Sequence, residues 1–145
     1  MTDTSIIAGG AAPANDTTLV SNAGSTFPIG TPVVASLSLP ETVIPGRANS
    51  ATTAHVIGLA SSSGVTGNKT FVQYLGAMTL TTAEWDVVTG QTGGLTLDKP
   101  YYLSSAAAGK LTTTAPAGGG TFKTPVGVAL SHTTMMVEMT FTIAN

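Results

Sequence analysis

The sequence contains no cysteine and few charged residues, and each shortage excludes a class of function. Without cysteine there is neither a disulfide framework nor thiolate chemistry. Charged residues make up 8% of the 145 residues, well below the ~25% that globular proteins usually carry. The five basic residues are spread singly along the chain. They form no basic stripe that could neutralise phosphates, so we expect no nucleic-acid partner.

Long apolar runs are absent as well. No uninterrupted apolar segment approaches the ~20 residues of a membrane-spanning helix. The first residues, MTDTSIIAGG, lack the basic and apolar regions of a signal peptide. We therefore expect a protein that is made in a cytoplasm and has no membrane partner.

Side chains that carry chemistry are few and scattered. His55 and His132 have no carboxylate at metal-ligand spacing. Residues 67–70 (GNKT) resemble a phosphate-binding loop, but Asn68 interrupts the pattern and no helix is expected to follow. The seven carboxylates suggest no facing pair of the kind that glycosidases use. We therefore expect no enzyme, no catalytic or cofactor-binding residue and no metal site.

Thr, Ser, Gly and Ala replace the missing charges, and hydrophobic residues reach 42%. Disordered chains combine low hydrophobicity with high net charge, whereas this chain has a formal net charge of −2. A single domain of this length buries about two-thirds of its unfolded surface. The composition therefore predicts a folded domain whose neutral, hydroxyl-rich surface packs closely against identical or neighbouring subunits.

Residues 1–30 differ in composition from the rest of the chain. The segment 8–14 (AGGAAPA) is of low complexity, and little in this region can form a core. The region is either a frayed terminus or an extended N-terminal arm that becomes ordered on a partner. We expect the arm over 1–30 and a β-rich domain over 31–145. The candidate partner-binding residues of the arm are the apolar pairs Ile6, Ile7, Leu19 and Val20.

A capping box predicts one short helical turn, over about residues 81–89. Thr81 and Glu84 have the spacing at which a hydroxyl and a carboxylate each accept a free backbone N–H. Gly90 follows where a left-handed residue would end the turn. Trp85 lies in the first turn, at a position that favours a core side chain over an exposed sugar-stacking platform.

Period-two alternation bounded by glycine, proline and asparagine predicts strands along the rest of the chain. The expected strands cover residues 32–35, 51–60, 70–80, 101–104, 110–114, 125–131 and 135–143. Residues 40–47 (PETVIPGR) are expected to form a turn-rich crossover. Strands at this spacing predict an all-β fold, a single β-sandwich or barrel-like domain.

Two of these segments resemble each other, VIGLAS at 56–61 and PVGVALS at 125–131. The shared glycine, Gly58 in one and Gly127 in the other, predicts a bulge or a close approach of backbones. We expect the two strands to be neighbours.

The segment richest in turn and strand signals, GGL…YYLS…GKLTTTAP…PVGVALS preceded by AEWD, resembles a β-module of tailed-bacteriophage virion structural proteins. The module is found in small capsid decoration (cement) proteins and in segments of head or tail fibres. The resemblance extends over about residues 53–140. It implies a non-enzymatic capsid decoration protein on the virion exterior. Such a protein binds the major capsid protein of the mature head as an oligomer, most often a homotrimer, and stabilises the lattice.

The resemblance also leaves a second function open, that of a head-fibre, tail-fibre or spike segment that binds a host-surface receptor or glycan. Tyr101 and Tyr102 follow each other on an expected strand, so one of them should face outward. An exposed aromatic side chain there would favour receptor binding. Both tyrosines are therefore candidate partner-binding residues.

Overall fold

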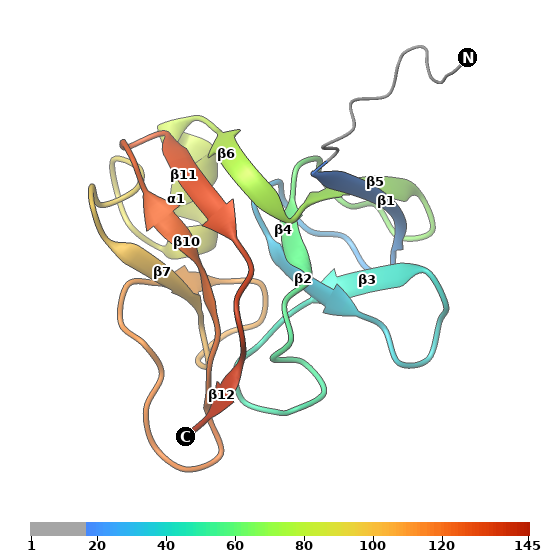
Figure 1. Cartoon of the computed structure of the whole chain (residues 1–145). Coiled ribbons are helices and arrows are strands. Elements are labelled where there is room, and N and C mark those ends of the chain that lie inside the picture. The colour runs from blue at the N-terminus through green and yellow to red at the C-terminus, as the bar shows by residue number, and fades with distance from the viewer. Residues whose placement is uncertain (1–16) are drawn as a thin grey trace.

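The computed structural model describes residues 17–145. These residues fold into a closed five-stranded barrel, built from the N-terminal half, and a five-stranded sheet that carries the helix α1 (Figure 1). A two-stranded ribbon holds the C-terminal end of the chain. The predicted all-β, barrel-like fold with one short helix is confirmed for this part of the chain.

The barrel strands are short, and their hydrogen-bonded order is β1-β3-β2-β4-β5, with β5 returning to β1. They are β1 (Thr18–Ala23), β2 (Pro32–Ala35), β3 (Thr42–Pro45), β4 (Gly58–Ala60) and β5 (Lys69–Gln73). Neighbouring strands are antiparallel except for β1 and β3, which run parallel. The barrel interior is filled by Ala23, Phe27, Val33, Val43, Ala60 and Val72.

The sheet has the order β6-β11-β10-β7-β8. Its strands are β6 (Leu75–Thr79), β7 (Pro100–Leu103), β8 (Leu111–Thr112), β10 (Pro125–Ala129) and β11 (Thr134–Glu138). The ribbon pairs β9 (Phe122–Lys123) with β12 (Ile143–Ala144). In β11 the predicted alternation is present, because Met135 and Val137 are buried and Met136 between them is exposed.

The helix α1 (Thr82–Thr89) begins and ends where the sequence predicts. The Thr81 hydroxyl accepts the Glu84 N–H at 3.1 Å, and a Glu84 carboxylate oxygen accepts the Thr81 N–H at 2.9 Å. Gly90 ends the helix in the left-handed conformation, with φ of 72°. Trp85 is fully buried, as predicted.

One hydrophobic core joins the two lobes seen in Figure 1. Val34 and Leu59 come from barrel strands, and Trp85, Leu103 and Met135 come from the sheet and its helix, yet all five belong to one buried cluster. Because a domain is defined by its own core, barrel and sheet form one domain.

The predicted arm over 1–30 is wrong in its C-terminal part. β1 lies within this range and pairs along its length with β5, from Thr18↔Gln73 to Asn22↔Lys69. Phe27, which follows β1, is buried in the barrel. Six residues with a weak alternation are enough for a strand when barrel neighbours supply the hydrogen bonds. Residues 1–16, with the first of the apolar pairs, lie outside the described residues.

The predicted strand over 70–80 is two strands. It is broken at Tyr74, and its halves β5 and β6 belong to the barrel and the sheet. The Gln73 side-chain amide donates to the carbonyls of Leu75 and Ala77, both at 3.1 Å, and so stabilises the break. The chain passes from one lobe to the other here (Figure 1).

Three other strand predictions are corrected by the structure. The expected crossover over 40–47 contains β3. Pro45 is the last residue of this strand and Pro40 lies before its start, so neither proline interrupts it. The expected strand over 135–143 ends at Glu138, and Phe141 beyond it is 90% exposed. The expected strand over 51–60 is shorter, since only its last three residues form β4.

The two glycine-containing strands are not neighbours, because β4 lies in the barrel and β10 in the sheet. Each glycine nevertheless permits a close approach, as predicted. A Cβ on Gly58 would meet the Val72 side chain and the Gln73 carbonyl, and one on Gly127 would meet the Met136 carbonyl oxygen. The register of β10 against β7 also shifts next to Gly127, which marks a bulge.

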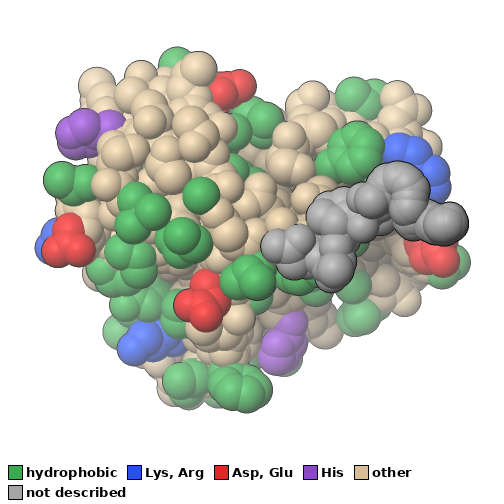
Figure 2. All heavy atoms as spheres, turned by 45° about the horizontal axis from the view of Figure 1, so that its top comes forward, with side chains coloured by type: hydrophobic (Ala, Val, Ile, Leu, Met, Phe, Trp, Pro, Cys, Tyr) green, Lys and Arg blue, Asp and Glu red, His purple; other side chains and the backbone are tan. Residues whose placement is uncertain are grey.

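The surface is largely neutral. Figure 2 shows a face that consists mostly of uncharged polar side chains and backbone, with scattered hydrophobic side chains and a few isolated charges. Fourteen large hydrophobic side chains are exposed in residues 17–145, and they include Val20, Leu37 and Leu39.

Replacing Trp85 by Ala should lower the free energy of unfolding by about 3–5 kcal/mol, because it empties the centre of the shared core. It also removes the indole N–H that donates to the Thr133 carbonyl at 2.8 Å. Val87→Ala is the control on the same helix, at a half-exposed side chain, and should be close to neutral. Chemical denaturation of both variants is the measurement, and equal small effects would contradict a core role for Trp85.

Replacing Gly127 by Ala should cost about 1–3 kcal/mol, because the added methyl group would overlap the Met136 carbonyl of the paired strand. Gly119→Ala is the matched control, since nothing lies within 4 Å of the added methyl group there. Thermal unfolding should separate the two variants clearly. Equal melting temperatures would show that β10 and β11 are not packed as closely as described.

Candidate docking site at the mouth of the barrel

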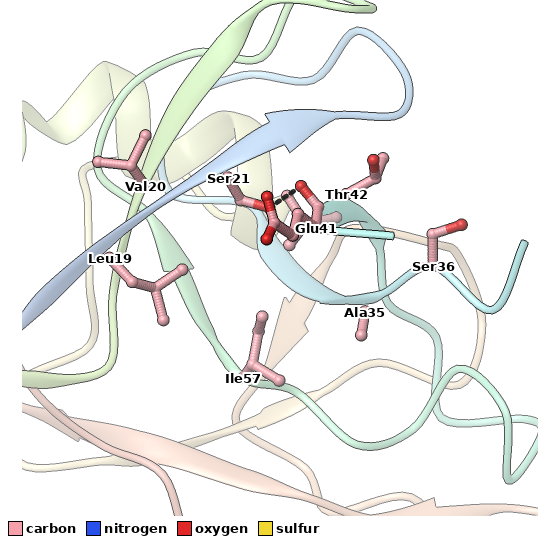
Figure 3. Close-up of a pocket in the computed structure, with 9 residues that line it drawn as sticks. Leu19, Val20, Ser21, Ala35, Ser36, Glu41, Thr42 and Ile57 are labelled. Carbon is pink, nitrogen blue, oxygen red and sulfur yellow. Dashed lines mark hydrogen bonds between the residues drawn. The ribbon is translucent and has the colours of Figure 1, made fainter. Parts of the chain in front are cut away.

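Two neighbouring hollows meet at one end of the barrel, where both are lined by Ala35 and Ile57. The first, of about 420 Å³, is the open mouth of the barrel. Figure 3 shows its lining, in which Leu19, Ala35 and Ile57 point into the same space and Val20 points away from it. The remaining lining comes from Ser21, Ser36, Glu41, Thr42 and Val43.

The mouth is open because β1 and β3 separate there. Among the described residues they pair at two positions, Asn22↔Thr42 and Ala23↔Val43. Before Asn22, β1 follows β5 and leaves β3. Leu19 and Ile57 are partly buried and pack on the barrel core from this side, so they cover the interior without filling the mouth.

The second hollow, of about 360 Å³, lies on the other side of Ala35. Its lining is apolar except for Thr52 and the imidazole of His55. It continues into a third hollow that runs along the loop between β2 and β3, and Leu37 and Thr52 line both. The end of β2 is therefore flanked by apolar, concave surface on both sides.

The loop between β2 and β3 is held in place by its own serine. The Ser36 hydroxyl accepts the N–H groups of Ser38 and Leu39, at 3.3 and 3.2 Å. Leu37 is 78% exposed and Leu39 is 55% exposed. We call these two side chains the leucine tip. Large apolar side chains on an ordered loop beside an apolar hollow are typical of a protein–protein contact surface.

The lining supplies little chemistry. Glu41 and His55 are its ionisable side chains, and within residues 17–145 no three His, Asp or Glu side chains come close enough together to hold a metal ion. Helix α1 aside, this part of the chain has no helix, and α1 is far too short and polar to span a membrane. The geometry suits binding of an apolar segment or a neighbouring protein surface.

The structure brings some of the predicted partner-binding residues to this site. Leu19 lines the mouth, and Val20 beside it is 57% exposed. Ile6 and Ile7 lie outside the described residues. The leucine tip was not predicted, because exposed leucines in a Ser-Leu-Ser-Leu loop have no periodic signal that separates them from core residues.

Tyr101 is not a contact residue, contrary to prediction. It is fully buried, and its hydroxyl donates to Gln91 Oε1 at 2.6 Å and accepts the Thr96 N–H at 2.7 Å. Tyr102 is half-buried, and the Lys123 ammonium lies 5.8 Å from its ring centroid. The predicted alternation of side chains along β7 is present. The loop after α1 covers the face of the strand that carries Tyr101.

No protein-family model and no curated protein matches this sequence. The geometry of the barrel mouth and the leucine tip is therefore the main guide to function.

Replacing Tyr101 by Phe should destabilise the protein by about 1–3 kcal/mol, because the Thr96 N–H and the Gln91 amide oxygen would lose a buried partner. Tyr102→Phe, on the half-buried neighbour, is the control and should change stability little. Urea titration gives the difference. A Tyr101→Phe variant as stable as wild type would mean that water reaches the hydroxyl and that the side chain is accessible after all.

Proposed function

We propose that this protein is a non-enzymatic structural protein of a tailed-bacteriophage virion, a capsid decoration (cement) protein. In this proposal it lies on the exterior of the mature head and binds the major capsid protein. It acts as an oligomer, a homotrimer, and bridges neighbouring capsid subunits so that the lattice resists internal pressure. The resemblance of residues 53–140 to decoration and fibre modules supports the phage assignment.

The observation that carries the proposal is the leucine tip beside the apolar hollows. Exposing Leu37 and Leu39 to water is unfavourable by roughly 25 cal/mol for each Å² of apolar surface, and the ordered loop gives them no cover within the described residues. Covering them by a neighbouring protein recovers that free energy. The scarcity of charge supports the same conclusion, because the centres of protein interfaces are depleted in charged residues.

Repetition around a symmetry axis supports the oligomer. The two side chains of the leucine tip bury too little surface for a strong single contact, since stable interfaces bury about 1,200–2,000 Å² in total. Several weak contacts held in one assembly act together, and their combined avidity exceeds each affinity by 10²–10⁴. A lattice of identical capsid subunits offers such repeated contacts.

The alternative function, a fibre or spike segment that binds a host-surface receptor or glycan, gains little support from the two tyrosines. An exposed aromatic side chain at one of them would favour it, but Tyr101 is buried and Tyr102 is half-buried. A half-buried Tyr102 beside Lys123 does not make a stacking platform for a sugar ring.

The leucine tip can be tested by co-sedimentation with capsids of the source phage that lack this protein. Leu37→Ser with Leu39→Ser should weaken binding about tenfold or more, since buried interface anchors contribute over 1 kcal/mol each. Leu97→Ser with Leu130→Ser is the matched control. Both control leucines are 54% exposed and lie elsewhere on the surface, so that variant should bind like wild type.

Two outcomes would contradict the proposal. Equal binding of both double variants would show that the leucine tip is not the docking surface. A wild-type protein that ignores capsids but binds tails, or label confined to the tail in immuno-electron microscopy, would favour the fibre function.

A further inference from the structure

We propose that the free edge of β2 at Ala35 is a strand-addition site, and that its occupant is the chain's own N-terminal segment around Ile6 and Ile7. In this arrangement the segment 5–8 (SIIA) lies along β2 as an added strand. Ile6 and Ile7 then fill the two hollows that meet at Ala35. The inference concerns the isolated protein and does not depend on the function proposed above.

The backbone at Ala35 supplies the hydrogen-bonding edge. The Ser36 N–H donates to the Thr42 carbonyl of the β3 side at 2.8 Å. Alternate residues of an antiparallel strand bond to the same neighbour, so the Ala35 N–H and carbonyl point away from β3. On that other side, the pairing of β2 with β4 ends at Val33↔Gly58. Within residues 17–145, no strand is paired with Ala35 there.

The two hollows match two consecutive apolar residues. Successive side chains of a strand point to opposite faces. The two hollows share Ala35 and Ile57 and otherwise have different lining, Leu19 and Val43 in the first and Val34 and Leu37 in the second. An added strand would place one side chain in the mouth of the barrel, beside Leu19 (Figure 3). The next would enter the second hollow, beside Leu37. This mode of binding uses main-chain bonds for affinity and pockets for side-chain selection.

The segment 1–16 contains one sequence suited to this role. Apart from Met1, Ile6 and Ile7 are its large apolar residues, and they are β-branched, which favours strands. The residues on both sides, Ser5 and Ala8, are small and uncharged. The acidic side chains of the segment, Asp3 and Asp16, lie outside the dipeptide.

The tether is long enough and favours the same chain over a second copy. The described chain begins at Thr17, next to β1, whose Leu19 lines the mouth. The ten residues 8–17 have a full extension of about 33–36 Å. Such a tether gives an effective concentration in the millimolar range, far above that of a second molecule in dilute solution.

Paramagnetic relaxation in the full-length protein tests the inference. The chain has no cysteine, so Ala8→Cys accepts a single nitroxide spin label. The amide signals of Ala35, Leu37 and Ile57 should be lost through broadening. The signal of Val128 should remain, because Val128 lies in β10 of the sheet, in the lobe on the other side of the molecule from β2 and β3 (Figure 1).

Two charge variants separate recognition from mere proximity. Ile6→Asp with Ile7→Asp, in the labelled protein, should restore the signals of Ala35 and Leu37. Ala11→Asp with Ala12→Asp adds the same charge in the linker and should leave the broadening in place. Neither variant alters a described residue, so the fold is not at risk.

Three outcomes would overturn the proposal. The Ala35 signal could persist in the labelled protein, or the double aspartate at 6 and 7 could leave the broadening unchanged. The third outcome uses a mixture of two proteins, one with the isotope and no nitroxide, the other with the nitroxide and no isotope. Broadening in this mixture would be as strong as in the protein that carries both the isotope and the nitroxide. That result would assign the site to the segment of a second copy.

Discussion

The parallel contact between β1 and β3 determines where the barrel opens to a binding partner. It closes the barrel through two residue pairs among those described, Asn22↔Thr42 and Ala23↔Val43, while β1 and β5 pair over five positions. A parallel pair is slightly less stable per residue than an antiparallel one. The closure is therefore the one parallel seam of the barrel among the described residues, and it is as short as the two-pair contacts of β4 with β2 and with β5. The mouth opens beside it. The hollow at the mouth and the partly covered Leu19 follow from this seam. The free edge of β2 has another cause, the end of its pairing with β4 at Val33↔Gly58.

A second constraint is the scarcity of charge, and two of the five basic side chains stabilise the fold itself. The Arg47 guanidinium donates to the carbonyls of Ser105 and Ala106, both at 2.9 Å. The Lys110 ammonium donates to the Val87 carbonyl at 2.6 Å, in the last turn of α1, where a cation also interacts favourably with the helix dipole. These side chains hold loops and a helix end, and they contribute little to a charged outer surface. The outer surface is therefore left to hydroxyl and apolar groups that can pack on another protein.

Local signals in the sequence predicted the parts of the fold that local chemistry determines. The capping box of Thr81 and Glu84, the burial of Trp85 and the need for glycine at position 127 depend on residues close in sequence or on sterics that any close approach imposes. The strands β1 and β3 were missed because their hydrogen bonds come from distant segments. Which of two adjacent tyrosines is buried depends on the loop after α1, and alternation alone leaves that choice open. The sequence predicted one part of the candidate docking site, the apolar pair at 19–20. It did not predict the leucine tip, because two exposed leucines in a loop give no periodic pattern.

A free strand edge beside apolar hollows is a liability, because its unpaired backbone groups are a template for pairing with other chains. Charged residues usually protect such edges, and this chain has few to spare. Covering the edge with the chain's own segment would solve the problem without charge. A competing surface would then have to overcome a tethered ligand at millimolar effective concentration, which a single weak contact cannot do. Contacts repeated by symmetry can displace the tethered segment. Under the proposed function, a β2 edge covered by residues 5–8 would therefore bias the protein toward assembled lattices and away from isolated partners.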